Sequence, residues 1–278
     1  MTVHAHGCRL ASPAADLRIP THVLDCLQAG YKICVVISND TDVIVALLFY
    51  MPIFFQEGLK ELWVWAGRGT TTRYAPLHIW NARLGPDLCA VLPALHSLTG
   101  CDITSKIGTK KAALKADPEI HLRGFGTTTP LTSAMIQNAE QYLVKVADVG
   151  SKSGNFLELR AYQFHFAKST SHQNLPPTSQ GLEDHIHRAF YNAYTTMHAL
   201  DRQLNIEIGD FDPVDYGFTL ENGHLLPSTS WKTLEPRWSL VCRCGKCARV
   251  TCPCREALVK CSVFCKCQKT ENCKNPYN

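Results

Sequence analysis

Residues 33–49 read ICVVISNDTDVIVALLF, and this stretch decides the fold. Its first five residues are a β-branched run that ends at Ser38 and Asn39, a pattern typical of a buried strand in a parallel sheet. After the acidic turn, residues 43–49 predict a helix. A strand that leads through a short turn into a helix is the repeating unit of α/β proteins. The stretch therefore predicts an α/β fold.

The flanking sequence continues this alternation. Apolar periodicity and turn residues predict a second strand at 62–66 and helices at residues 15–29, 86–98, 133–149 and 182–204. Hydrophobic residues make up 45% of the chain and charged residues 19%, a composition that can bury a core. The longest apolar run, 43–55, is shorter than the ~20 residues that cross a bilayer, so we expect no membrane span. No secretory signal is visible, which favours a reducing compartment.

Charge and cysteine separate the C-terminal tail from the rest of the chain. Residues 232–278 hold 10 of the 28 Lys and Arg and 3 of the 24 Asp and Glu, so the tail is +7 and the remainder −3. Nine of the 14 cysteines lie in the same tail. We therefore expect three parts: an α/β domain over 1–125, a mainly helical extension and linker over 126–231, and a cysteine-rich zinc domain over 232–278.

The spacing of the nine tail cysteines favours soft tetrahedral metal sites over disulfides, which need an even count and an oxidising compartment. Nine thiolates hold about three zinc ions if three of them bridge two metals. The predicted ligands are Cys242, Cys244, Cys247, Cys252, Cys254, Cys261, Cys265, Cys267 and Cys273. Cations between them are predicted to contact phosphates: Arg243, Lys246, Arg249, Arg255, Lys260 and Lys266. A structural zinc knot without a binding role is the alternative.

At these residues the tail resembles the tesmin/TSO1-like CXC domain, a nine-cysteine, three-zinc module of chromatin-associated DNA-binding proteins. The match covers residues 242–275 and includes the final C-x-N of Cys273 and Asn275. The resemblance implies DNA contact. Thr251 stands where paired-repeat members carry a Tyr that enters the minor groove, so contacts to the DNA backbone are expected to dominate.

Carboxylates follow the first predicted strand. Asp40 and Asp42 lie at its C-terminal end, where ligands bind in an open parallel sheet. Asp102 follows a predicted helix end within HSLTGCDITSKIGTKKAALK. These hard oxygen ligands suit Mg²⁺ or Mn²⁺, which can orient a phosphate and activate water. The segment with Lys110 and Lys111 can hold a backbone phosphate. The alternative interpretation of each acidic turn is an ordinary helix cap.

Together, SNDTDVIVALL and LPALHSLTGCDITSKIGTKKAALK resemble the PIN-like core of the flap-endonuclease/XRN 5′ nuclease superfamily. The closest similarity is to a transposon-associated branch of animal genomes whose members often carry a cysteine-rich tail. The resemblance implies a PIN-like parallel sheet with flanking helices, a helical extension and a metal-dependent catalytic site at Asp16, Asp40, Asp42 and Asp102. The strand that begins the PIN-like core has no counterpart in this sequence. The two glutamates of the EEADTRI-like helix start are also missing, and Asp16 remains.

Three functional hypotheses follow. The first is a nuclear, DNA-binding protein of mobile-element origin, in which a degenerate nuclease-like domain accompanies a zinc-cluster tail. The second is an active Mg²⁺- or Mn²⁺-dependent nuclease, so the sequence leaves enzymatic activity open. The third is a zinc-stabilised protein-interaction module without a role in nucleic-acid binding.

Overall fold

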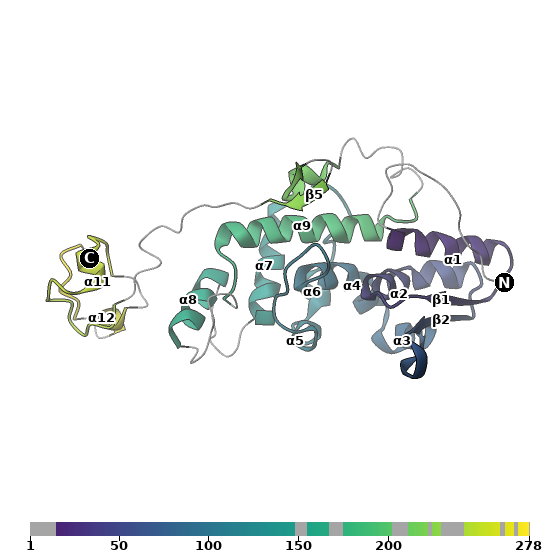
Figure 1. Cartoon of the computed structure of the whole chain (residues 1–278), viewed down its shortest axis with the longest axis horizontal. Helices are drawn as coiled ribbons and strands as arrows, with labels where there is room; N and C mark the ends of the chain where they lie inside the picture. The colour runs from purple at the N-terminus through teal and green to yellow at the C-terminus, as the bar shows by residue number, and fades with distance from the viewer. Residues whose placement is uncertain are drawn as a thin grey trace. The chain divides into compact units, whose positions relative to one another are not determined.

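The computed structural model describes residues 15–147, 155–166, 175–201, 211–221, 224–228, 242–261, 265–269 and 272–277. The chain divides into two compact units. Unit 1 comprises Met1–Ala147 and Leu182–Ser228, and unit 2 comprises Asp148–Gly181 and Thr229–Asn278. The elements of both are drawn in Figure 1.

Unit 1 is mixed α/β, as the sequence predicts. Its first half contains η1 (Ala15–Arg18), α1 (Ile19–Gln28), β1 (Ile33–Ile37), α2 (Thr41–Gln56), β2 (Glu61–Ala66), η2 (Gly69–Thr71), β3 (Arg73–Pro76), α3 (Leu77–Leu84) and α4 (Pro86–Thr99). Short helices and a long one follow: α5 (Lys110–Lys115), α6 (Pro118–His121) and α7 (Ser133–Ala147).

The remaining elements are α8 (Phe156–Phe166), α9 (Ser179–Met197), η5 (Pro213–Tyr216), β4 (Phe218–Glu221), β5 (His224–Pro227), α11 (Pro253–Glu256) and α12 (Lys266–Lys269). The predicted helix at 182–204 is therefore observed with an earlier start and an earlier end. Residues 202–204 of that prediction, and residues 148 and 149 of the helix predicted at 133–149, lie outside the described residues.

The main sheet has the order β1-β2-β3. β1 pairs parallel with β2, which confirms the predicted parallel pair, and β3 adds an antiparallel strand that the sequence analysis missed. A parallel pair needs a crossover connection, and α2 supplies it. Helices α1, α2 and α3 pack on one face of the sheet, where Leu62 and Val64 join a common core. Figure 1 shows α1 and α2 running beside β1 and β2.

The other face of the sheet corrects one prediction. The run at 33–37 was expected to be buried on both faces, but Ile33, Val35 and Ile37 are more than half exposed. Their cross-strand neighbours on this face include Trp65, which stacks on Tyr74 with ring centroids 6.1 Å apart. Apolar β-branched composition marks strand propensity, whereas burial depends on whether another element covers the face. No described helix does so here.

This difference between the two faces predicts unequal costs for one substitution. Val64 is fully buried, whereas Val35 is 54% exposed. We expect Val64→Ala to lower the free energy of unfolding by about 2 kcal/mol, because it leaves a cavity in the core. Val35→Ala should cost less than about 0.5 kcal/mol. Urea unfolding of both variants measures the difference, and equal losses would show that the outer face is covered in solution.

Candidate functional site

The turn between β1 and α2 fixes the positions of Asp40 and Asp42. Asp40 is the N-cap of α2, and its Oδ1 accepts a hydrogen bond from the backbone N–H of Asp42 at 2.8 Å. The backbone N–H of Asp40 donates to Ser38 Oγ at 3.0 Å. Asn39 Oδ1 accepts from the N–H of Gly67 at 2.6 Å, which ties this turn to the end of β2. Both acids therefore lie at the carboxyl end of the parallel strands, as predicted.

His96 and Lys110 hold the side chain of Asp42 in place. His96, on α4, is 7% exposed and its Nε2 lies 2.5 Å from Asp42 Oδ1. Lys110 donates from Nζ to His96 Nδ1 at 3.1 Å. Because an ammonium only donates, this contact favours the ring tautomer that has a lone pair on Nδ1 and its proton on Nε2, facing the carboxylate. The contact of His96 with Asp42 could not be predicted from the sequence, because the two residues are 54 positions apart in the chain.

Asp16 and Asp102 complete the predicted acidic set. The pKa of Asp16 is raised by burial first and then by the negative charges of Asp40, Asp42 and Asp102, so all four acids are electrostatic neighbours. Among the residues that the structure describes, however, only cysteines form groups whose candidate ligand atoms all lie within 4.8 Å of one another. The acids thus share one region without closing around a single point, and the repulsion at Asp16 is what a bound cation would relieve.

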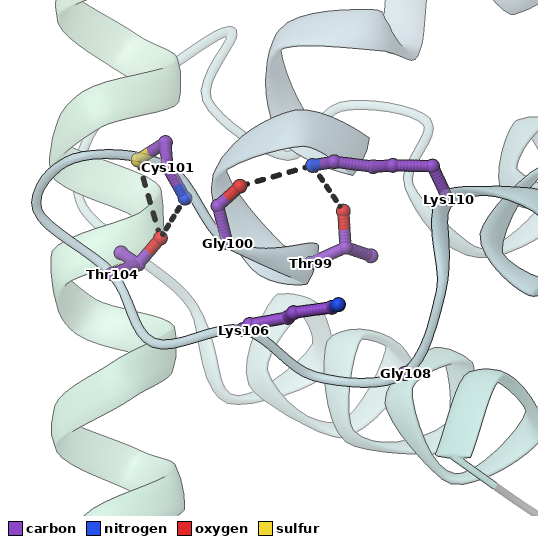
Figure 2. A pocket seen from close by; sticks show the side chains of 7 residues that line it. All are labelled: Thr99, Gly100, Cys101, Thr104, Lys106, Gly108 and Lys110. Atoms are coloured by element: carbon purple, nitrogen blue, oxygen red, sulfur yellow. Dashed lines mark hydrogen bonds between the residues drawn. The ribbon is translucent and has the colours of Figure 1, made fainter.

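A cavity of about 300 Å³ lies in the loop between α4 and α5. Figure 2 shows the Lys110 side chain at its rim, donating to Thr99 Oγ1 at 2.8 Å and to the carbonyl of Gly100 at 3.0 Å. Burial lowers the pKa of Lys110. Of the two lysines predicted to contact nucleic acid, Lys110 has its amine held by hydrogen bonds within the protein, and both Lys110 and Lys111 have exposed side chains. Lys106 also lines the cavity, and no partner for its amine is found in the described part of the chain.

Helix α9 fixes the end of α4 and the loop that follows it. Asn192 Nδ2 donates to Ser97 Oγ at 2.9 Å, and His185 Nε2 donates to the carbonyl of Leu98 at 2.9 Å. Thr104 Oγ1 donates to the carbonyl of Ser97 at 2.6 Å. These bonds connect residues 185–192 to the motif that carries Asp102. No local pattern in the sequence predicts them.

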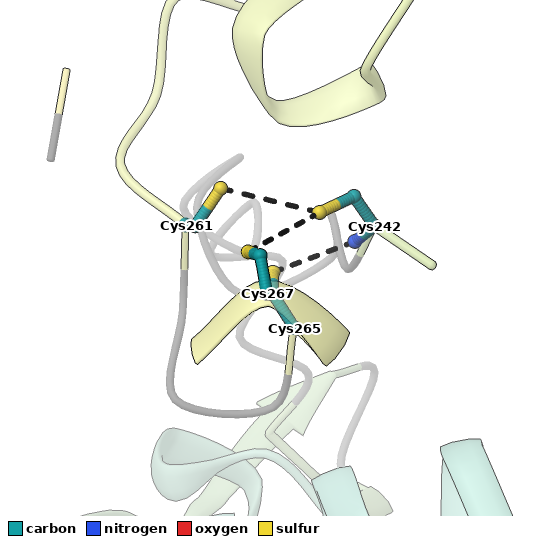
Figure 3. Close-up of side chains that lie close together, drawn as sticks. All are labelled: Cys242, Cys261, Cys265 and Cys267. Atoms are coloured by element: carbon teal, nitrogen blue, oxygen red, sulfur yellow. Dashed lines mark hydrogen bonds between the residues drawn. The ribbon is translucent and has the colours of Figure 1, made fainter. Parts of the chain in front are cut away.

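The tail cysteines gather into one cluster, as expected. Sulfur–sulfur distances from Cys242 are 3.2 Å to Cys247, 3.8 Å to Cys267 and 4.0 Å to Cys261. Figure 3 shows the sulfur atoms of Cys242, Cys261 and Cys267 turned toward one another. Zn–S bonds of ~2.3 Å in a tetrahedron place sulfurs roughly 3.8 Å apart, which matches this spacing. None of the described cysteines forms a disulfide.

Three overlapping groups of four cysteines can hold a metal such as zinc. They are Cys242, Cys261, Cys265 and Cys267; Cys242, Cys247, Cys252 and Cys261; and Cys247, Cys261, Cys267 and Cys273. The remaining two predicted ligands are also at the cluster: Cys254 Sγ lies 3.7 Å from Cys265 Sγ, and Cys244 packs against the buried cysteines.

The protonation energetics of the cluster favour a bound cation. Burial, together with neighbouring sulfurs, raises the pKa values of Cys242, Cys247 and Cys261. Thiolates packed this closely repel one another, and water does not reach most of them. A metal ion removes this cost, because it takes the place of the protons and neutralises the thiolates. The chemistry of the donor set therefore fits zinc.

Most predicted phosphate-binding residues of the tail are exposed: Arg243, Lys246, Arg249, Lys260 and Lys266. Arg255 is half-buried and donates from its guanidinium to the carbonyl of Ala248 at 2.7 Å. Asn275 is buried and donates to Cys261 Sγ at 3.3 Å and to the carbonyl of Val259 at 2.9 Å. The tail thus has a sulfur interior and a cationic surface.

A comparison of the chain with protein-family models, curated proteins and solved structures finds no significant match in any of the three. No helix in the described ranges combines the length and apolar character needed to span a bilayer.

Contact between α9 and α4 predicts a pH dependence of stability. Burial lowers the pKa of His185 from 6.5 to about 4. The unfolded chain takes up a proton near pH 6.5, and the folded chain does so only near pH 4. Neutral His185 therefore makes its full contribution to the free energy of unfolding above pH 6.5. This contribution is lost as the pH falls toward 4. Between pH 7 and pH 5 the loss should be about 2 kcal/mol.

The matched variant is His185→Gln, which keeps a donor for the Leu98 carbonyl but does not titrate. Urea unfolding at pH 7 and pH 5 should show a loss about 2 kcal/mol smaller in this variant than in the original chain. An equal loss in both proteins would assign the acid sensitivity to other groups.

Proposed function

We propose that the chain binds DNA through its cysteine-rich tail, with about three zinc ions holding the tail in shape. The observation that carries this proposal is the combination of a sulfur cluster with cations on its surface. Zinc alone would account for the sulfurs. The exposed side chains of Arg243, Lys246, Arg249, Lys260 and Lys266 add a charge pattern that a structural knot does not need, and phosphates complement it.

Such contacts are directed at the DNA backbone, because lysine and arginine on a small rigid surface neutralise phosphates whatever the sequence. The resemblance to the CXC domain supports the same partner. If DNA is the partner, the protein acts in the nucleus. The similarity of unit 1 to PIN-like nucleases suggests that a nuclease-derived domain of mobile-element origin accompanies this tail.

Salt and zinc should both control DNA binding. If the tail neutralises about four phosphates, affinity for a short duplex should fall roughly 100-fold between 50 and 200 mM salt, because counterions are released on binding. Removal of zinc with a chelator should abolish binding, because the cationic surface would lose its shape. Fluorescence anisotropy measures both effects.

Arg249→Gln combined with Lys266→Gln should weaken this binding about tenfold and reduce the salt dependence. The matched control is Lys32→Gln with Lys60→Gln, which removes two exposed lysines from unit 1. Negligible, salt-insensitive DNA affinity would favour a protein-interaction module instead. Equal effects of the two double variants would mean that net charge, rather than the tail, determines binding.

A second function, metal-dependent cleavage of phosphodiester bonds, is favoured by one observation. Asp16, Asp40, Asp42 and Asp102 come from three separate segments and still share one electrostatic neighbourhood. Carboxylates arranged in this way attract Mg²⁺ or Mn²⁺, and such an ion can activate water beside a phosphate. The second oxygens of Asp40 and Asp42 have no partner in the described residues, which leaves them available as ligands.

This second function predicts that end-labelled single-stranded, duplex or flap DNA is cut in Mg²⁺ or Mn²⁺. Asp40→Asn and Asp102→Asn should each reduce the rate roughly 100-fold, because each removes a charged ligand. Asparagine is a good N-cap, so Asp40→Asn should keep the start of α2 folded. Asp87→Asn, at the opposite end of α4, is the control. If the protein binds DNA but does not cut it, the cleavage function is wrong and DNA binding by the tail remains.

A further inference from the structure

A chain of hydrogen bonds holds Asp42, and it runs through two residues that are not part of the acidic cluster. Its Oδ1 accepts from His96 Nε2, and His96 Nδ1 accepts from Lys110. Lys110 is in turn fixed by Thr99 Oγ1 and the carbonyl of Gly100. Three segments therefore meet at one carboxylate: the start of α2, the last turns of α4 and the start of α5.

The lysine decides which tautomer the histidine adopts. A neutral imidazole carries one proton, which can sit on either nitrogen. An ammonium beside Nδ1 requires a lone pair there, so the proton sits on Nε2 and points to Asp42. Without the lysine, the ring can place its proton on Nδ1. A lone pair on Nε2 would then face the carboxylate and repel it.

This arrangement divides the two oxygens of Asp42 between two tasks. Oδ1 is committed to His96, and Oδ2 is the oxygen left for a ligand. Hydrogen bonds of this kind behind a metal-binding carboxylate orient it and are worth 10- to 100-fold in metal affinity. The same division applies to Asp40, whose Oδ1 caps α2.

We propose that His96 and Lys110 are positioning residues that fix the orientation of Asp42 toward a divalent cation. The proposal rests on the second function above, in which the acidic cluster binds such a cation. Electrostatics alone makes the opposite prediction for Lys110. A positive charge near the cluster repels a cation, so its removal would tighten binding if orientation did not matter.

The first measurement requires no metal. Ring ¹⁵N chemical shifts of His96 in the full chain should show protonated Nε2 and an acceptor Nδ1. Lys110→Met should change this pattern toward a mixture of tautomers. Lys106→Met, which removes a neighbouring lysine that lines the same cavity, should leave it unchanged. A ring protonated on Nδ1 in the original chain would overturn the proposal, whatever the protein does with metals.

The second measurement is Mn²⁺ affinity by electron paramagnetic resonance, with zinc retained in the tail. We expect His96→Phe and Lys110→Met to weaken binding at least tenfold. His96→Gln, which keeps a donor toward Asp42, should recover most of the loss. Lys106→Met should leave the affinity unchanged or raise it. Thermal unfolding midpoints identify any variant that fails to fold, and the remaining variants then decide.

The outcomes separate the two ideas. Unchanged or tighter Mn²⁺ binding in Lys110→Met would overturn the positioning role while leaving the cation site intact. No Mn²⁺ binding by the original chain would remove the cation site, and with it the role of His96 and Lys110 toward a cation, even if the expected tautomer is found. The expected tautomer together with weakened binding in Lys110→Met supports both.

Discussion

The parallel pairing of β1 with β2 constrains everything else in unit 1. Parallel neighbours need a long crossover, and α2 provides it by turning directly out of β1 and packing beneath the sheet. The sharp turn demands a cap, and Asp40 supplies it. Because strands and helices alternate in this way, the acids that start α2 lie at the carboxyl end of the sheet. Helix α4 then packs against α2 and brings His96 to Asp42.

A different constraint governs the tail. Its described core consists of cysteines, with Val259 packed against them, so apolar burial contributes little. Sulfurs 3.2–4.0 Å apart cannot all ionise without a cation between them. A metal ion bound by these cysteines would therefore supply most of the free energy that folds this part of the chain, and its cationic surface would depend on that folding. Asn275, which donates to Cys261, ties the last residues of the chain to the cluster.

The two faces of the main sheet show how composition and burial separate. Leu62 and Val64 lie in the core, while Ile33, Val35 and Ile37 are exposed on a face shared with Trp65 and Tyr74. The same β-branched run thus has one side in contact with helices and one side open in the described structure. Strand formation needs only local conformational preference and ladder hydrogen bonds, whereas burial needs a partner from elsewhere in the chain or beyond it.

The sequence by itself determined the features that are local in the chain. Periodicity located β1, β2, α4 and α7 within a few residues, spacing identified the nine cysteines as one cluster, and the D-x-D turn marked the carboxyl end of a strand. The tertiary structure alone decided which distant groups meet. Asp42 and His96 are 54 residues apart, and His185 and Leu98 are 87 apart. Hydrogen bonds between packed helices leave no periodic trace in a sequence, because each partner is compatible with its own helix whether or not the other is present.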